Sequence, residues 1–203
     1  MGEHYYTKQP TCREEIEEIK VNIFGNEITL KTASGVFSIG RLDKGTQVLL
    51  NLCQINKNDR VLDLGAGYGI VGIAIAKAFP ESSVVLTDVN QRAIKLARQN
   101  IKLNKLDNVS AVSGDCFEKV KGNFDTILLN PPQVAGKKIC EKMIEESRQY
   151  LNPGGTLQIV ARKNKGGETL AKKISEVFGK FEVLGKKGGF WVYCGKRTNS
   201  RGE

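Results

Sequence analysis

The sequence predicts an α/β protein whose core is a doubly wound, mostly parallel sheet. From residue 60 onward, short apolar segments typical of strands alternate with longer segments typical of helices. A glycine-rich loop within VLDLGAGYGIVG (61–72) joins the first of these strands to the first helix. Two β-rich runs joined only by GKKGG follow the last helix, and they predict a terminal antiparallel hairpin.

The core elements can be assigned in order from their composition and periodicity. Short β-branched and leucine-rich runs predict the strands Arg60–Leu64, Ser83–Thr87, Val109–Val112, Phe124–Leu129 and Thr156–Ala161. Apolar residues at helical spacing predict the helices Gly69–Phe79, Gln91–Leu103, Lys137–Leu151 and Gly167–Phe178. The segment NPGG at 152–155 predicts a turn. The terminal hairpin is predicted to pair Phe181–Leu184 with Phe190–Tyr193.

A separate hairpin is predicted before this core. The segment IKVNIFGNEITLK alternates apolar and polar residues around Gly25-Asn26, which is a strong signal for a tight β-turn. We expect residues 1–45 to form an N-terminal extension and residues 46–203 to form the domain proper. A chain of 203 residues is long enough for one domain with a sizeable core.

Composition excludes several classes of protein. No apolar run approaches the roughly 20 residues that span a bilayer, and MGEHYYTKQP lacks the apolar core of a secretory signal. We therefore expect a cytoplasmic protein with no membrane partner. A zinc site is not expected, because the single histidine is His4 and the cysteines are scattered without CxxC spacing. These cysteines are Cys12, Cys53, Cys116, Cys140 and Cys194.

Positive charge is concentrated near the C-terminus. Residues 161–203 hold 11 Lys and Arg against 4 Asp and Glu, whereas residues 1–160 hold 20 against 18. A basic end on a nearly neutral body indicates either a polyanionic partner such as RNA or simply a well-solvated surface.

The glycine-rich loop predicts a nucleotide or nucleoside ligand. Gly67-x-Gly69-x-x-Gly72 matches the dinucleotide fingerprint, and Asp88 follows at about the 20-residue distance of a ribose-binding acid. However, Asp63 stands just before the loop, where a carboxylate disfavours a pyrophosphate and suits a ligand with a cationic amino group.

Three motifs in order resemble those of a known family. VLDLGAGYG resembles motif I of class I S-adenosylmethionine-dependent methyltransferases, and NPP (130–132) resembles their motif IV. GVFSIGRLDKGTQVLL (35–50) is similar to the segment before motif I in small-domain methyltransferases related to the 16S rRNA guanine N2-methyltransferase, above all the short archaeal-type members. The resemblance implies a seven-stranded Rossmann-like methyltransferase sheet with an antiparallel last strand.

The resemblance also implies the cofactor, S-adenosylmethionine, and the residues that bind it. Gly65, Ala66 and Gly67 would line its amino-acid part, with Asp63 anchoring the loop, and Asp88 would bind the ribose hydroxyls. Asp115 would lie near the adenine, flanked by Cys116. No metal is implied.

The corner LLNPPQ carries the expected chemistry. Two prolines fix the backbone after the strand and push Asn130 out of the helical region. In the family, the asparagine side chain and the next carbonyl hold an amine for methyl transfer, so Asn130, Pro131 and Pro132 are the predicted catalytic corner. Family members often have an aromatic residue where this chain has Gln133. A different aromatic residue could stack on the target base, from Phe37, Tyr5, Tyr6 or Trp191.

The predicted function is methylation of an exocyclic amine of a base in RNA, with guanine in ribosomal RNA as the leading substrate. A tRNA base, a protein glutamine amide and a non-catalytic RNA-binding role are the alternatives. Arg162, Lys163 and Lys165 are predicted to contact RNA phosphates, because they follow the fifth core strand. Lys186 and Lys187 are assigned to the opposite edge as solvated charges. The sequence does not specify an oligomeric state.

Overall fold

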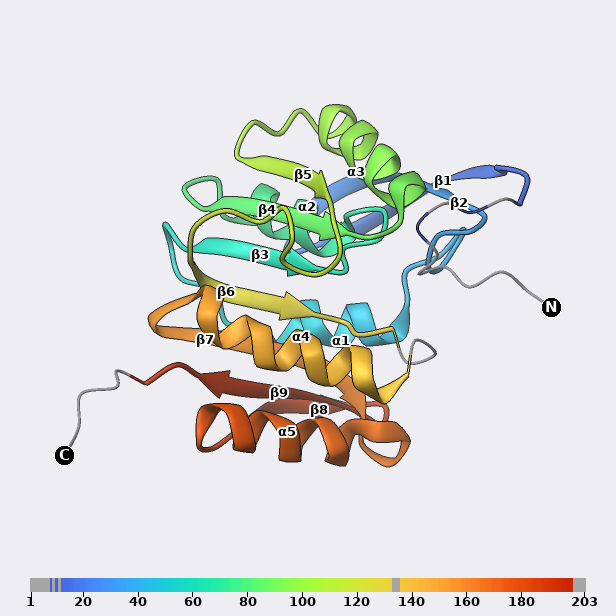
Figure 1. Cartoon of the computed structure of the whole chain (residues 1–203). Coiled ribbons are helices and arrows are strands. Elements are labelled where there is room, and N and C mark those ends of the chain that lie inside the picture. The colour runs from blue at the N-terminus through green and yellow to red at the C-terminus, as the bar shows by residue number, and fades with distance from the viewer. Residues whose placement is uncertain (1–7, 9, 11, 133–135, 199–203) are drawn as a thin grey trace.

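A computed structural model describes residues 8, 10, 12–132 and 136–198, and it confirms the predicted fold class (Figure 1). Its centre is a seven-stranded sheet in the order β5-β4-β3-β6-β7-β9-β8. The strands from β5 to β7 are parallel, and β9 runs antiparallel to both of its neighbours. The strands are β3 (Arg60–Leu64), β4 (Ser83–Asp88), β5 (Val109–Ser113), β6 (Phe124–Leu129), β7 (Leu151–Arg162), β8 (Glu182–Lys187) and β9 (Phe190–Lys196).

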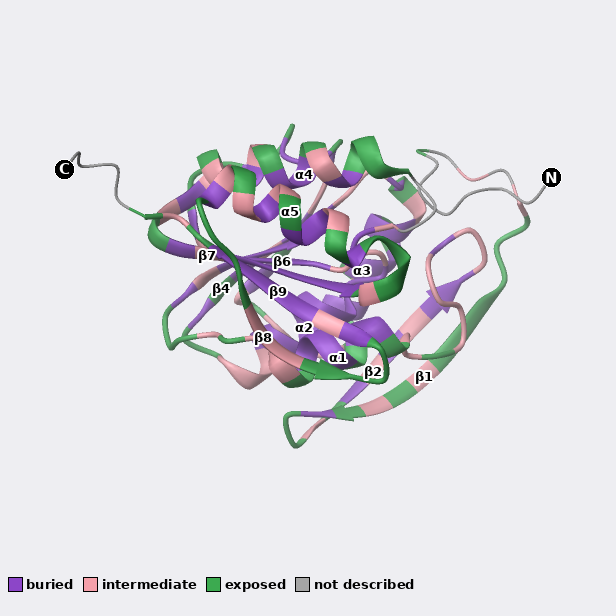
Figure 2. Cartoon of the chain, turned by 90° about the horizontal axis from the view of Figure 1, so that it is seen from below, coloured by how far each residue is buried: buried purple, intermediate pink, exposed green. Residues whose placement is uncertain are grey.

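Helices cover both faces of the sheet. One face carries α1, which contacts β7, β8 and β9, together with α2 and α3, which contact β3, β4 and β5. The other face carries α4 against β7 and α5 against β9, so that the strands form a buried middle layer (Figure 2). The helices are α1 (Lys44–Leu52), α2 (Ile70–Ala78), α3 (Gln91–Leu103), α4 (Lys137–Tyr150) and α5 (Glu168–Phe178), and the kinked turn η1 (Lys163–Gly167) precedes α5.

The alternation of side chains along β3 divides the core between the two faces. Val61 packs in the cluster beneath α1, α2 and α3, whereas Leu62 and Leu64 pack in the cluster beneath α4 and α5. A parallel strand covered on both faces must be apolar in both directions, which explains its continuous apolar sequence. The same alternation directs Asp63 to the face of Val61 and α2.

The start of β7 differs from the prediction. NPGG does not form a free turn, because β7 begins at Leu151, directly after α4. The pairing of β7 with β6 is irregular here, and Gly154 has a φ of +81°. Gly154 and Gly155 exchange backbone hydrogen bonds with Arg197 on the other side. Pairing with the chain after β9 therefore holds a glycine-proline segment in the sheet as a bulge.

The predicted N-terminal hairpin is present and forms a separate two-stranded sheet. It consists of β1 (Ile16–Ile23) and β2 (Asn26–Ala33). Asn100 of α3 and Asn104, the C-cap of α3, attach it to the core: the Asn100 side chain bonds the backbone of Lys31, and the Asn104 side chain bonds that of Thr29. The division of the chain at residue 45 stays a prediction.

Candidate active site

The carboxyl ends of β3, β4 and β6 meet at one edge of the sheet, where a cavity of about 280 Å³ lies. Most of the predicted site residues line it: Phe37, Gly65, Gly67, Asp88, Asp115, Cys116, Asn130, Pro131 and Pro132. Sequence reasoning missed several others, among them Val36, Ile139, Lys142 and Met143. The three last residues come from α4, whose place above the site follows from the tertiary fold.

Glycines keep the floor of the cavity open. Gly65 and Gly67 have φ values of +72° and +57°, which residues with a Cβ rarely adopt. A Cβ built at either position would meet nothing within 4 Å, so a side chain there would occupy open space above the loop. The Thr87 carbonyl accepts hydrogen bonds from the N–H groups of Gly65 and Ala66, at 2.9 and 3.0 Å. Ala66 therefore braces the loop.

Asp88 ends β4 and fixes two turns at once. Its Oδ2 accepts from the Gly67 N–H at 2.8 Å, and its Oδ1 accepts from the Asn90 N–H at 2.8 Å. Burial raises the pKa of Asp88, and these two backbone donors oppose that rise. Each carboxylate oxygen can accept a second hydrogen bond, which leaves acceptor capacity for a ligand in the cavity.

Asp63 supports the loop from beneath and is not among the residues that line the cavity. It is 3% exposed, and its Oδ2 accepts from the Gly72 N–H in the first turn of α2 at 2.9 Å. Burial raises the pKa of Asp63 to about 7. Asp63 can therefore affect a cationic ligand only indirectly, since it bonds the first turn of α2 and does not line the cavity. Its role in anchoring the glycine loop stays a prediction.

Asp115 and Cys116 follow β5 and line the cavity, and Asp115 is joined to α4. Lys142 Nζ bonds Asp115 Oδ2 at 3.1 Å. The Cys116 thiol and then Lys142 lower the pKa of Asp115, whereas burial raises the pKa of Cys116 to about 12. Cys116 is therefore a neutral thiol at physiological pH.

Asn130 stands at the end of β6 and is held by α1. Its Nδ2 donates to Thr46 Oγ1 at 2.9 Å and to Asp43 Oδ2 at 3.2 Å. Asp43 is the N-cap of α1, because Asp43 Oδ2 accepts from the Thr46 N–H at 3.0 Å. The sequence gave no sign that either residue contacts Asn130.

The candidates for stacking on a base can now be separated. Phe37 lines the cavity beside Asn130. Trp191 lies under the ammonium groups of Lys163 and Lys186, at 5.0 and 4.0 Å from the ring centroid. Gln133, Tyr5 and Tyr6 lie outside the described residues. Phe37 is thus the candidate that the geometry supports.

A basic groove adjoins the cavity and shares Phe37 with it. Its lining includes Arg41, Lys44 and Arg162, with Phe190 at its wall. Arg162 lies over the Phe190 ring at 4.7 Å. Because β6 and β7 are parallel neighbours, Arg162 is at the same edge as the NPP corner. Lys163 pairs with Glu168 at 3.8 Å, and Lys165 is exposed in η1.

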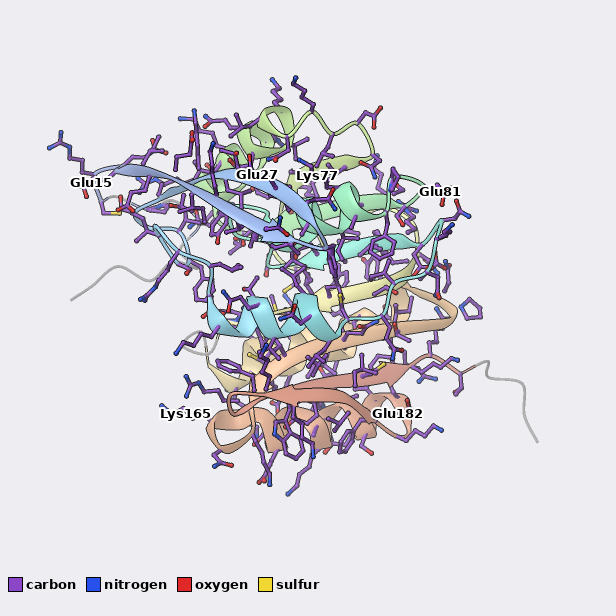
Figure 3. All side chains as sticks on the ribbon, turned by 180° about the vertical axis from the view of Figure 1, so that it is seen from behind. Glu15, Glu27, Lys77, Glu81, Lys165 and Glu182 are labelled. Atoms are coloured by element: carbon purple, nitrogen blue, oxygen red, sulfur yellow. The ribbon has the colours of Figure 1, made fainter. Side chains whose placement is uncertain are left out.

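The assignment of Lys186 and Lys187 to the opposite edge is wrong. Since β9 runs antiparallel to β7 and pairs Phe190 with Arg162, the turn between β8 and β9 lies at the carboxyl end of β7. The Lys163 N–H bonds the Gly189 carbonyl at 3.2 Å. Figure 3 shows Lys165 at one end of the β8–β9 hairpin and Glu182, the first residue of β8, at the other end. The two lysines therefore add to the basic end beside the site.

Comparison with known proteins agrees with this geometry. The family model described as methyltransferase small domain matches residues 27–194. The chain belongs to this methyltransferase family. The uncharacterized protein YbxB of Bacillus subtilis is 32% identical over 98% of the chain and 100% of its own length. A ribosomal RNA small subunit methyltransferase C of Haemophilus influenzae is 33% identical over 83% of the chain and 51% of its own length.

A solved structure extends the comparison to the fold. The T. thermophilus 16S rRNA N2 methyltransferase RsmC, in complex with AdoMet and guanosine, matches with a TM-score of 0.81 and 26% identity. The match covers 93% of this chain and 52% of that one. The chain thus spans about half the length of the RNA methyltransferases named here. The predicted family and the predicted Rossmann-like methyltransferase fold are confirmed.

Proposed function

We propose that the cavity binds S-adenosylmethionine and that the chain transfers its methyl group to the exocyclic amine of a guanine in ribosomal RNA. The single observation that carries the proposal is the meeting of the glycine loop, Asp88 and the NPP corner around one cavity. The fit is chemical as well as spatial: open glycine backbone for the amino-acid part, a carboxylate for the ribose and apolar walls from Cys116 and Met143 for the adenine.

In this proposal, the residues of the corner orient the amine. The cofactor supplies a methyl group already activated on a sulfonium, so the protein needs to align the two reactants more than to provide an acid or base. The lone pair of an exocyclic amine is delocalised into the ring. Two fixed acceptors, Asn130 Oδ1 and the Pro131 carbonyl, would hold its hydrogens and turn the lone pair toward the methyl group. Positive charge develops on this nitrogen, so these acceptors stabilise the transition state most.

The groove beside the cavity supports an RNA substrate over a protein glutamine. Arg41, Lys44 and Arg162 line the groove, and Lys163 and Lys186 lie over Trp191, the residue after Phe190 of the groove wall, which gives a basic surface for a polyanion. Phe37, between cavity and groove, would stack on the target base. Guanine is favoured over other bases by the similarity to rRNA methyltransferases and by the guanosine bound in the T. thermophilus structure. A tRNA substrate would use the same groove.

Methyl transfer assays on defined RNA test the proposal. The purified chain is incubated with labelled S-adenosylmethionine and either 16S rRNA, small ribosomal subunits or tRNA, and the products are digested to nucleosides for mass spectrometry. We expect N2-methylguanosine from ribosomal RNA, formed at least 100-fold more slowly by the Asn130→Ala variant. Label in tRNA alone or in a protein glutamine would overturn the assignment of substrate, and failure to bind S-adenosylmethionine would overturn the whole proposal.

A further inference from the structure

The amide of Asn130 has a defined orientation. Asp43 Oδ2, when ionised, can only accept hydrogen bonds, so the group that faces it must be the NH₂ end of the amide. Thr46 Oγ1 engages the same nitrogen. Both donor hydrogens of Asn130 are therefore used by Asp43 and Thr46, and the amide oxygen takes no part in these bonds.

The oxygen of this amide remains available as an acceptor at the cavity that Asn130 lines. Asn130 lines the cavity, and among the described residues no donor bonds its Oδ1. Gly45 allows this close approach of helix and corner: a Cβ at Gly45 would lie 2.9 Å from Asp43 Oδ2 and 3.4 Å from Asn130 Oδ1. The approach is thus made possible by a glycine in the first turn of α1.

The two groups that hold Asn130 are themselves well anchored. Thr46 is 3% exposed, and its backbone N–H bonds Asp43. The helix that carries them packs against β7, β8 and β9. Rotation of the Asn130 side chain would break two hydrogen bonds to groups that the capped first turn of α1 holds in place, so the orientation of Asn130 is preorganised before any substrate binds.

We propose that Asp43 and Thr46 are positioning residues that fix Asn130 for catalysis. They hold its Oδ1 as an acceptor for the amine, and the carboxylate charge of Asp43 polarises the amide so that Oδ1 becomes a stronger acceptor as positive charge develops. This inference rests on the proposed methyl transfer. The inference assigns a function to the segment LDKGT (residues 42–46). One oxygen of Asp43 both caps α1 and orients Asn130.

Variants can separate capping from positioning. Asp43→Ser keeps a capping hydroxyl for α1 but is too short to reach Asn130 as well. Thr46→Val removes the acceptor at nearly constant shape, and Thr46→Ser keeps it. In single-turnover assays with saturating RNA and cofactor, we expect Thr46→Val and Asp43→Ser each to slow methyl transfer at least tenfold. Thr46→Ser should restore most of the rate, and cofactor affinity should stay within threefold throughout.

A double-mutant cycle tests whether the effect acts through Asn130. In the Asn130→Ala background, Thr46→Val and Asp43→Ser should cause no further loss of rate, because there is no amide left to orient. Losses that multiply with that of Asn130→Ala would overturn the inference. So would a wild-type rate in Thr46→Val.

A second measurement does not depend on the substrate. The side-chain NH₂ signals of Asn130 can be assigned by NMR from their loss in Asn130→Ala. In wild type we expect these hydrogens to exchange slowly with water, and in Thr46→Val to exchange at least tenfold faster. Equal exchange would refute the positioning. If wild type methylates no RNA, the proposed function fails, and the exchange rates still decide whether Asp43 and Thr46 hold the amide.

Discussion

Replacing Asp88 with alanine should weaken cofactor binding by a predictable amount. Backbone N–H groups bond both oxygens of this carboxylate, which still has acceptor capacity for a ribose hydroxyl at the end of β4. A hydrogen bond to a charged group contributes about 1.5–3 kcal/mol. Loss of one such bond to the ribose therefore predicts a roughly 10- to 150-fold higher Kd for S-adenosylmethionine.

Isothermal titration calorimetry of wild type and Asp88→Ala measures this change directly. Asp107→Ala is the matched control, because Asp107 is an exposed carboxylate before β5, at the opposite edge of the sheet. Its affinity should equal that of wild type. Thermal melts are needed as well, since the Gly67 and Asn90 N–H groups lose their acceptor in Asp88→Ala.

Two results would refute the reasoning about Asp88. The first is an unchanged Kd for S-adenosylmethionine in a folded Asp88→Ala variant, which would remove this carboxylate from the cofactor site. The second is tight binding of NADH by wild type with no heat from S-adenosylmethionine, which would restore the dinucleotide interpretation of the glycine loop.

Three further predictions follow. Asn130→Ala should lower the single-turnover rate at least 100-fold with cofactor affinity within a few-fold, because a preorganised acceptor is lost; normal turnover would contradict this. Three phosphate contacts at about 0.7 each predict a slope of log RNA affinity against log salt of about −2 for wild type. Replacing Arg162, Lys163 and Lys165 with alanine should flatten this slope, and an unchanged slope would exclude these residues from the RNA-binding surface. Asp63→Asn keeps an acceptor for Gly72 but not the charge. Because the pKa of Asp63 is raised to about 7, its contribution to stability is present below about pH 4 and is lost as the pH rises through 7. Wild type should therefore lose Tm relative to Asp63→Asn between pH 4 and 8, and parallel curves would contradict this.

Much of the fold could be predicted because its signals are local. The helix Gln91–Leu103 and the strands Arg60–Leu64 and Phe124–Leu129 have the predicted bounds, since periodicity and β-branched composition act within a few residues. NPGG was misjudged for the complementary reason. Its composition favours a turn, but pairing with β6 on one side and with Arg197 on the other makes it part of β7.

Part of the site could also be predicted, because parallel strands bring their carboxyl ends to one edge. That rule alone places Asp88 and Asn130 near the glycine loop. It fails for Lys186, whose position depends on β9 being inserted antiparallel beside β7. For Asp63, alternation along β3 was available from the sequence and would have directed its side chain away from the cavity.

The sequence by itself determined the strands and helices, the open glycine backbone at Gly65 and Gly67, and the stiff corner at Asn130, because each depends on the conformations of neighbouring residues. Only the tertiary structure decided which groups hold that corner. Asp43 and Thr46 reach Asn130 from 87 and 84 residues away, because the packing of α1 against β7, β8 and β9 brings its first turn to the corner after β6. Contacts of this kind follow from strand order and helix packing, and no local pattern in the chain encodes the distance between the atoms that meet.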